Sequence, residues 1–171
     1  MNDAASTFLI REHRHDDIAL VIRRHAELYE TEHGWGPAFA GLVAEVAHAF
    51  ERDFKPGLER AWIAEHAGAF AGCVFCVQRD ATSAQLRMLL VEPQHRGSGL
   101  GGRLVAECIR FARLAGYGTL VLWTNSTLDP ARRLYEREGF RLEREQPESV
   151  FGAGSNGQHW SLDLRAIQSP S

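Results

Sequence analysis

The strongest local signal in this chain is Gln94-His95-Arg96-Gly97-Ser98-Gly99-Leu100-Gly101-Gly102. It follows an apolar run, residues 85–91, that predicts a strand, and it leads into residues 104–112, whose apolar positions recur at helical spacing. Glycines at a strand-to-helix turn let the backbone bend tightly and present N–H groups at the positive end of a helix dipole. Such a loop is suited to a pyrophosphate, although a turn without a ligand would also use glycines.

Two other phosphate-binding motifs are excluded by their context. Residues 97–102 match the dinucleotide spacing G-x-G-x-x-G, but that fold requires the glycines after an early strand and an acidic residue at the end of the next one. Here the glycines lie in mid-chain and the next strand ends in Thr124-Asn125. A P-loop requires Gly-Lys-Ser/Thr where this chain has Gly102-Arg103-Leu104.

Composition indicates one well-cored domain. At 171 residues, 44% of them hydrophobic, the chain predicts a single domain over residues 1–171 with its core in about residues 6–165. The formal net charge of -3 gives no field that would attract nucleic acid. We find no targeting or membrane-spanning pattern, so we expect a cytoplasmic protein with no membrane partner.

The cysteines predict reduced core residues rather than a metal site. Cys73, Cys76 and Cys108 all have apolar neighbours and cannot all pair with one another. The first two have a zinc-like spacing, but residues three apart in a strand point to opposite faces, and no second pair exists. We therefore expect no bound metal.

The remaining pattern predicts alternating strands and helices. Strands are expected at residues 8–11, 61–64, 73–77, 85–91, 120–123, 140–142 and 160–164, with residues 151–158 as a polar connection. Helices are expected from about residue 16 to 32, through residues 39–50 and 104–112, and from 129 to 139. This order places the chain in the α/β class.

Read from Gln94, the glycine-rich stretch resembles the acetyl-coenzyme A signature of the GNAT N-acetyltransferases, Gln/Arg-x-x-Gly-x-Gly/Ala. Residues 131–140 resemble the second signature block of that family, and the likeness spans most of the chain. Residues 29–50, 111–135 and 157–160 look closest to the acetyltransferase half of proteins fused to a MarR-type DNA-binding domain, which is not present here. The resemblance implies a GNAT fold: a mixed, mostly antiparallel twisted sheet with helices on both faces.

The resemblance also implies where acetyl-coenzyme A (acetyl-CoA) binds. The edge of the strand at Leu89, Leu90 and Val91 would pair with the pantetheine amides, and a backbone N–H there would stabilise the oxyanion. Asn125 could contact pantetheine or only cap a turn. The full set of expected cofactor-binding residues is Leu89, Leu90, Val91, Gln94, Arg96, Gly97, Ser98, Gly99, Leu100, Gly101, Asn125 and Arg132.

For catalysis, the resemblance assigns Tyr135 as the acid that protonates the leaving thiolate. Packing in the core is the alternative for this tyrosine. Gln85 occupies about the position where some members carry a glutamate base, so the base is open. We take Glu92 as the first candidate; Glu32, His33, His159 or a chain of waters are alternatives.

Four residues are expected on the acceptor side: Tyr29, Glu32, Trp35 and His159. The aromatic ones could equally be core. The expected reaction is direct transfer of an acetyl group from acetyl-CoA to a primary amine of a small molecule or peptide. The alternative is an acetyl-CoA-binding sensor or partner-binding module without turnover. A homodimer is compatible with either function.

Overall fold

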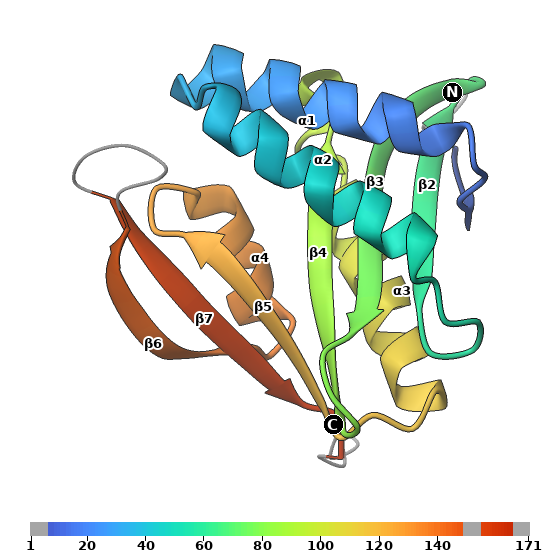
Figure 1. Cartoon of the computed structure of the whole chain (residues 1–171), viewed down its shortest axis with the longest axis vertical. Helices are drawn as coiled ribbons and strands as arrows, with labels where there is room; N and C mark the ends of the chain where they lie inside the picture. Colours follow the sequence, from blue (N-terminus) through green and yellow to red (C-terminus); the bar gives the residue numbers. More distant parts are fainter. Residues whose placement is uncertain (1–6, 149–154, 166–171) are drawn as a thin grey trace, which may run out of the picture.

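The computed structural model describes residues 7–148 and 155–165, which form one seven-stranded sheet flanked by helices (Figure 1). The strands are β1 (Phe8–Glu12), β2 (Arg60–His66), β3 (Ala69–Gln78), β4 (Ser83–Val91), β5 (Thr119–Asn125), β6 (Arg141–Glu148) and β7 (Ser155–Asp163). The helices are α1 (Asp17–His33), α2 (Pro37–Arg52), α3 (Leu100–Leu114), α4 (Asp129–Arg137) and a short 3₁₀ turn, η1 (Pro93–His95). None of these helices combines the length and the apolar character that crossing a membrane requires.

The strand order is β1-β2-β3-β4-β5-β7-β6. All neighbours in this order pair antiparallel except β4 and β5, which run parallel and are joined through α3. A parallel pair needs such a crossover, whereas β2 and β3 are joined by the tight turn at Ala67 and Gly68. The prediction of a mixed, mostly antiparallel sheet is confirmed.

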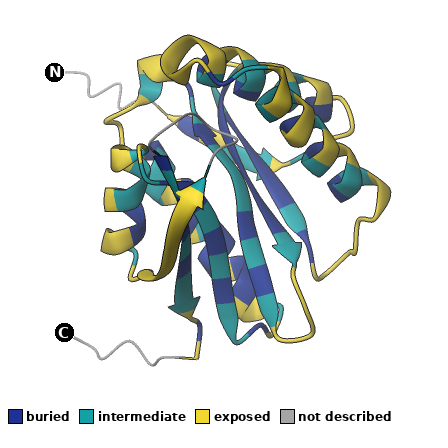
Figure 2. Ribbon diagram, turned by 60° about the vertical axis from the view of Figure 1, so that its left-hand side comes forward, coloured by how far each residue is buried: buried dark blue, intermediate teal, exposed yellow. Residues whose placement is uncertain are grey.

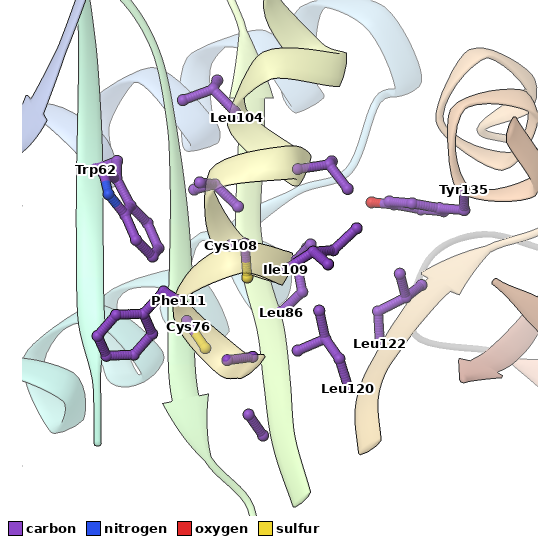
Figure 3. Packing of buried hydrophobic residues seen from close by; sticks show 14 of the residues in the cluster. Trp62, Cys76, Leu86, Leu104, Cys108, Ile109, Phe111, Leu120, Leu122 and Tyr135 are labelled. Carbon is purple, nitrogen blue, oxygen red and sulfur yellow. The ribbon is translucent and has the colours of Figure 1, made fainter. Parts of the chain in front are cut away.

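Hydrophobic residues pack against both faces of the sheet. On one face, Val21 of α1 and Phe50 of α2 meet Ile63 and Phe75 of the sheet. On the other, α3 contributes Leu104 and Cys108, with α4 alongside (Figure 3). Figure 2 shows the burial concentrated in the central strands, with the outer faces of the helices exposed. The prediction of helices on both faces is confirmed.

The parallel pair is joined along only part of its length. Ser83–Leu86 of β4 pair with Thr119–Leu122 of β5, and no pairing continues beyond Leu86. On its other side, β5 pairs with β7 along its whole length, from Thr119 to Asn125. The second half of β4 therefore has β3 on one side and no strand on the other (Figure 1).

The last two strands extend further than the sequence predicts. Residues 155–158 lie in β7 rather than in a connection, and residues 151–154 of that predicted connection lie outside the described residues. β6 continues to Glu148, although its side chains are exposed along almost all of its length. No apolar alternation marks such a strand, because pairing with β7 rather than burial holds it in the sheet.

Candidate active site

The second half of β4 contains a bulge. Opposite Val74 of β3, β4 places two residues, Met88 and Leu89, and Met88 has a positive φ of 58°. This conformation is uncommon for a residue with a side chain and marks a segment that its surroundings hold in place. Because one extra residue is inserted, the pleat is shifted from Leu89 to Val91.

Gly72 permits β3 to approach this bulged segment. A Cβ atom at Gly72 would lie 2.5 Å from the carbonyl oxygen of Leu90, a distance that real Cβ atoms essentially never show. The absence of a side chain on β3 is therefore required for the position of Leu90 and Val91 on β4.

The glycine-rich loop connects β4 to α3 as predicted. Gly97 and Gly99 have φ values of 78° and 86°, which side chains disfavour. Gly99 is the N-cap of α3 and has no side chain; the Leu100 N–H donates to Ser98 Oγ at 3.4 Å, and Gly101 and Gly102 follow it in the first turn. The N–H groups of this turn and the helix dipole therefore favour an anion at the start of α3.

A cavity of about 490 Å³ joins the loop, the bulged half of β4, α4 and the end of α1. It brings together ten of the residues that the sequence predicts for the site: Tyr29, Glu32, Leu89, Leu90, Val91, Arg96, Gly97, Gly99, Leu100 and Gly101. Its walls are mainly apolar, with the polar backbone of the loop at one end. An elongated ligand with an apolar middle and an anionic end fits this arrangement.

Aromatic rings cover the α1 side of the cavity. Tyr29, which lines it, stacks on Trp35 with ring centroids 5.1 Å apart, and Phe39 lies 4.8 Å from the same tyrosine. His33 also lines the cavity and stacks on Trp35 at 4.9 Å. Burial raises the pKa of Tyr29 to about 12, so its hydroxyl stays protonated. Trp35 itself is buried behind these rings and does not line the cavity.

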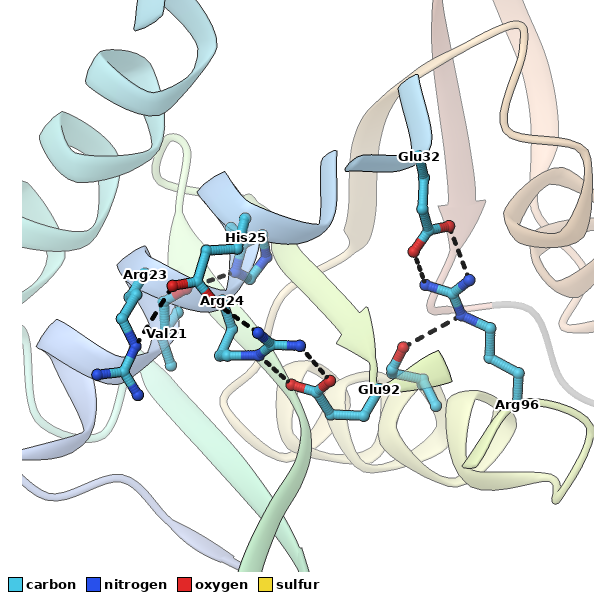
Figure 4. A network of polar contacts seen from close by, with 9 residues as sticks. Val21, Arg23, Arg24, His25, Glu32, Glu92 and Arg96 are labelled. Carbon is cyan, nitrogen blue, oxygen red and sulfur yellow. Dashed lines mark hydrogen bonds and ion pairs between the residues drawn. The ribbon is translucent and has the colours of Figure 1, made fainter. Parts of the chain in front are cut away.

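Arg96 crosses the cavity from the loop to α1. Both Nη atoms donate to the carboxylate of Glu32, at 2.7 and 2.8 Å, and Nε donates to the carbonyl of Val91 at 3.3 Å (Figure 4). The pair lowers the pKa of Glu32 and raises that of Arg96. Arg96 therefore has a carboxylate partner in addition to any role in binding phosphate.

Glu92 directly follows β4 and pairs with Arg24 of α1. Its two carboxylate oxygens accept hydrogen bonds from Nε and Nη2 of Arg24 at 2.6 and 2.7 Å (Figure 4). The Glu92 side chain is only 6% exposed and does not line the cavity. This geometry argues against Glu92 as the base, because both carboxylate oxygens are bound by Arg24 and the side chain does not reach the cavity.

Tyr135 extends from α4 with its hydroxyl pointing toward α3 and β4 (Figure 3). It is buried, and burial raises its pKa above the ordinary value. This hydroxyl forms no hydrogen bond with a residue that the structure describes, so it is able to donate one. Its neighbour Leu134, rather than Tyr135 itself, lines the cavity.

The other predicted residues lie outside the cavity lining. The Asn125 side chain is engaged in a turn, since Oδ1 accepts from Thr127 and Nδ2 donates to Ser155. Arg132 donates to Ser126 and Asp129, and His159 lies on β7 beside Arg144. Gln94 is exposed in η1, and Ser98 donates to the carbonyl of His95.

Sequence reasoning missed most of the wall that α4 contributes. The lining residues not predicted are Leu28, His33 as a wall, His95, Gly102, Thr127, Leu128, Pro130, Ala131, Leu134 and Arg137. The i, i+3 spacing of Leu128, Ala131 and Leu134 places them on one face of a helix and could have identified this wall. Within residues 7–148 and 155–165, no group of three or more potential metal ligands is present.

Comparison with known proteins agrees with this geometry. Residues 22–140 match the model of the Acetyltransferase (GNAT) family. The chain belongs to the GNAT acetyltransferase family. An uncharacterised N-acetyltransferase from Schizosaccharomyces pombe is 31% identical over 128 residues, covering 74% of this chain and 76% of the relative. The N-acetyltransferase 8 of Rattus norvegicus is 34% identical over 130 residues, covering 73% of this chain but only 54% of the relative.

Solved structures share the fold of this GNAT chain. A GNAT-family acetyltransferase from Desulfovibrio desulfuricans superposes with a TM-score of 0.72 at 25% identity, over 92% of this chain and 99% of that one. An acetyltransferase from Salmonella typhimurium, solved with its cofactor acetyl-CoA, gives a TM-score of 0.73 at 20% identity. That match covers 97% of this chain and 99% of the Salmonella protein.

Proposed function

We propose that this GNAT acetyltransferase uses acetyl-CoA to acetylate a primary amine of a small molecule or peptide by direct attack. The observation that carries the proposal is the cavity in which the unpaired half of β4 meets the glycine-rich start of α3. Family membership, the N-acetyltransferase names of the relatives and the acetyl-CoA bound to the Salmonella neighbour support it.

The residues present fit acetyl-CoA. The open edge of β4 from Arg87 to Val91 offers backbone groups with which pantetheine amides can pair as an added strand. Leu89, Leu90 and Leu134 give this part of the cavity an apolar wall. The loop from Arg96 to Gly101 offers N–H groups to the pyrophosphate.

When bound there, acetyl-CoA supplies an activated acetyl group as a thioester. We assign stabilisation of the developing oxyanion to a backbone N–H of Leu90 or Val91, since N–H groups fixed in a dry site act without reorganising. Tyr135 donates its hydroxyl proton to the sulfur of the leaving thiolate, because this proton has no other recorded acceptor among the described residues.

The acceptor amine must be neutral to attack, so a proton has to leave it. Of the candidate bases, Glu92 and Glu32 are held in ion pairs and His159 lies outside the cavity. His33 lines the cavity and has no recorded hydrogen bond or ion pair with a described residue. We therefore assign proton acceptance to His33 or to water that it contacts. His33→Gln should lower kcat, whereas the exposed His48→Gln should not.

Three finer expectations are part of the proposal. The likeness to acetyltransferase halves of MarR-type fusions, the cytoplasmic location and a homodimer rest on the sequence alone. The chain spans 54% of the rat N-acetyltransferase 8 and 31% of the N-acetylaspartate synthetase of Danio rerio, so the acceptors of those proteins are not carried over. The synthetase's name makes free amino acids a sensible part of an acceptor panel.

The function is tested by release of free coenzyme A from acetyl-CoA in the presence of an amine panel. We expect acetyl-CoA to raise the melting temperature far more than NAD or ATP, and at least one amine to stimulate release. Gly99→Glu and Gly99→Ala both strain the backbone at φ 86°, but only glutamate adds a negative charge where the pyrophosphate binds. Equal acetyl-CoA affinity of the two variants would show that the loop has been misassigned. Binding without turnover on any amine would favour the sensor.

A further inference from the structure

Helix α1 contacts β4 on either side of residues 89–91, the segment that lines the cavity. We call this segment the donor segment. Arg24 binds Glu92 through two hydrogen bonds just after the strand. The next residue, His25, is buried against the backbone of Met88 at the bulge, with its Nδ1 donating to Val21. Leu89, Leu90 and Val91, which line the cavity, lie between Met88 and Glu92 in the chain.

A second ion pair joins α1 to the glycine-rich loop, with the positive and negative charges exchanged between the helix and its partner. Arg24 of α1 contributes the cation to its pair with Glu92, whereas Glu32 of α1 contributes the anion to its pair with Arg96. The two α1 residues are eight apart, so they lie about two turns from each other on one side of the helix. A shift of α1 by two turns would bring Arg24 toward Arg96, which like-charge repulsion opposes. The charges therefore specify one register of α1 on the β4-to-α3 segment.

The Arg24–Glu92 pair is the more buried of the two. Glu92 is 6% exposed and Arg24 is 26% exposed, against 30% and 47% for Glu32 and Arg96. Removing charges from water is costly, and a buried ion pair is often no more stabilising than well-packed apolar side chains of the same volume. Stability alone thus gives little reason for a charged pair at this place, whereas geometry gives one: two hydrogen bonds fix the strand end in direction as well as distance.

We propose that Arg24 and Glu92 are positioning residues for acetyl transfer. The pair holds the end of β4 so that the backbone N–H of Leu90 or of Val91 that stabilises the oxyanion faces the thioester, and it ties that strand to the helix carrying Tyr29 and His33. The donor segment and the acceptor wall are thereby kept at a fixed separation. This inference rests on the proposed function, and it replaces proton acceptance by Glu92 with a role in orientation.

The test uses a double variant in which both members become apolar, Arg24→Met with Glu92→Met. Changing one member alone would leave the other charge buried and unpaired, which destabilises the fold regardless of any catalytic role. The double variant leaves no such charge, so its melting temperature should stay near that of the wild type. We expect kcat to fall about 10- to 100-fold, the scale of a small misplacement of reacting groups. Acetyl-CoA affinity should change less, because the loop still holds the pyrophosphate.

Matched controls come from the same helix. Arg23→Met removes an adjacent exposed arginine whose contact with Glu27 is 3.9 Å long, and Glu27→Gln removes the other partner of Arg24. Neither should change kcat. Arg24→Lys keeps the charge but not the two-point geometry, so it should give an intermediate kcat at an unchanged melting temperature.

The outcomes distinguish a failure of the proposed acetyltransferase function from a failure of the positioning role. If the wild type binds acetyl-CoA but acetylates no amine, the proposed function fails before the variants are compared. If the wild type is active and both the double variant and Arg24→Lys keep its kcat, the positioning role is wrong. If the double variant does not fold, Arg24→Lys alone decides, with wild-type kcat overturning the inference and a reduced kcat supporting it.

Discussion

The two halves of β4 belong to one continuous strand but have different surroundings. Ser83–Leu86 pair with β5, and Ala84–Leu86 of this half also pair with β3; Ala84 and Leu86 are buried in the core. Arg87–Val91 pair on one side only, contain the bulge at Met88 and border the cavity. We call these the closed half and the open half. The comparison teaches that the site arises where one strand loses a neighbour, so equivalent changes in the two halves should have different effects.

The largest difference in kcat is expected between variants of two tyrosines, one beside the open half of β4 and one near the closed half. Tyr135 lies beside the open half, whereas Tyr117 just precedes β5 at the closed end and donates its hydroxyl to the carbonyl of Leu58 at 2.8 Å. Tyr135→Phe should lower kcat by roughly 100- to 10,000-fold, as expected for a positioned acid. Acetyl-CoA affinity and melting temperature should change little, because the hydroxyl has no recorded partner to lose. Steady-state rates, calorimetry and thermal unfolding measure the three quantities.

Tyr117→Phe is the matched control. It removes a buried hydrogen bond and should cost about 1 kcal/mol of unfolding free energy while leaving kcat unchanged in the folded protein. Near-wild-type turnover of Tyr135→Phe would exclude Tyr135 as an essential acid and make it a packing residue.

A smaller contrast is expected between two glycines. Gly72→Ala places a Cβ 2.5 Å from the Leu90 carbonyl, which is backbone and can move only by separating β3 from the open half. This should cost about 1–3 kcal/mol of unfolding free energy and weaken acetyl-CoA binding as well. At the closed end, Gly118→Ala meets only the flexible side chain of Arg165, at 3.4 Å, and should be close to neutral in both measurements. Urea unfolding and acetyl-CoA titration of the two variants would test this, and equal effects would remove the distinction between the halves.

The smallest effect concerns His25, which lies against the bulge of the open half. Burial lowers the pKa of His25 to about 4, so the folded protein resists a proton that the unfolded chain takes up near pH 6.5. Stability from this group is complete above pH 6.5 and is lost as the pH falls from 6.5 toward 4. Relative to pH 7, the loss at pH 5 is about 2 kcal/mol.

His25→Phe keeps the ring volume and removes this titration, so the difference in unfolding free energy between pH 7 and pH 5 should shrink by that amount. His48→Gln, at an exposed position, is the control. His13, whose pKa is also lowered by burial, contributes to the remaining acid sensitivity in every variant. An unaltered pH dependence of His25→Phe would mean that His25 takes up its proton without cost in the folded state.

The sequence predicts the parts of the site that are local in the chain. The run from Leu89 to Gly101 lies on consecutive elements, so apolar patterning and glycine placement suffice to find the strand, the loop and the start of α3. The order of strands and helices follows from the same patterns. The resemblance to the GNAT family, carried by Gln94 to Gly99, then supplies the fold that the family model and the solved structures support.

What the sequence could not give depends on contacts between distant residues. Arg24 and Glu92 are 68 positions apart, and nothing in either neighbourhood marks them as partners. From the sequence alone, Glu92 beside the glycine-rich loop is a reasonable base. In the folded chain it is bound by Arg24 instead. Asn125 is similar, because only its contacts with Thr127 and Ser155 distinguish a turn cap from a ligand contact. Which partner a polar side chain hydrogen-bonds depends on the folded chain, and the spacing of residues in the sequence does not reveal it.

The three cysteines give the protein a built-in optical reporter. Cys73, Cys76 and Cys108 are free and buried, and they are all the cysteines in the chain. A chromogenic thiol reagent added to the folded enzyme should therefore colour only with the coenzyme A released by turnover. If a variant unfolds during the assay, three protein thiols per chain become reactive and appear as a burst that does not depend on the amine. A single cuvette can thus separate a slow catalyst from a chain that has lost its structure.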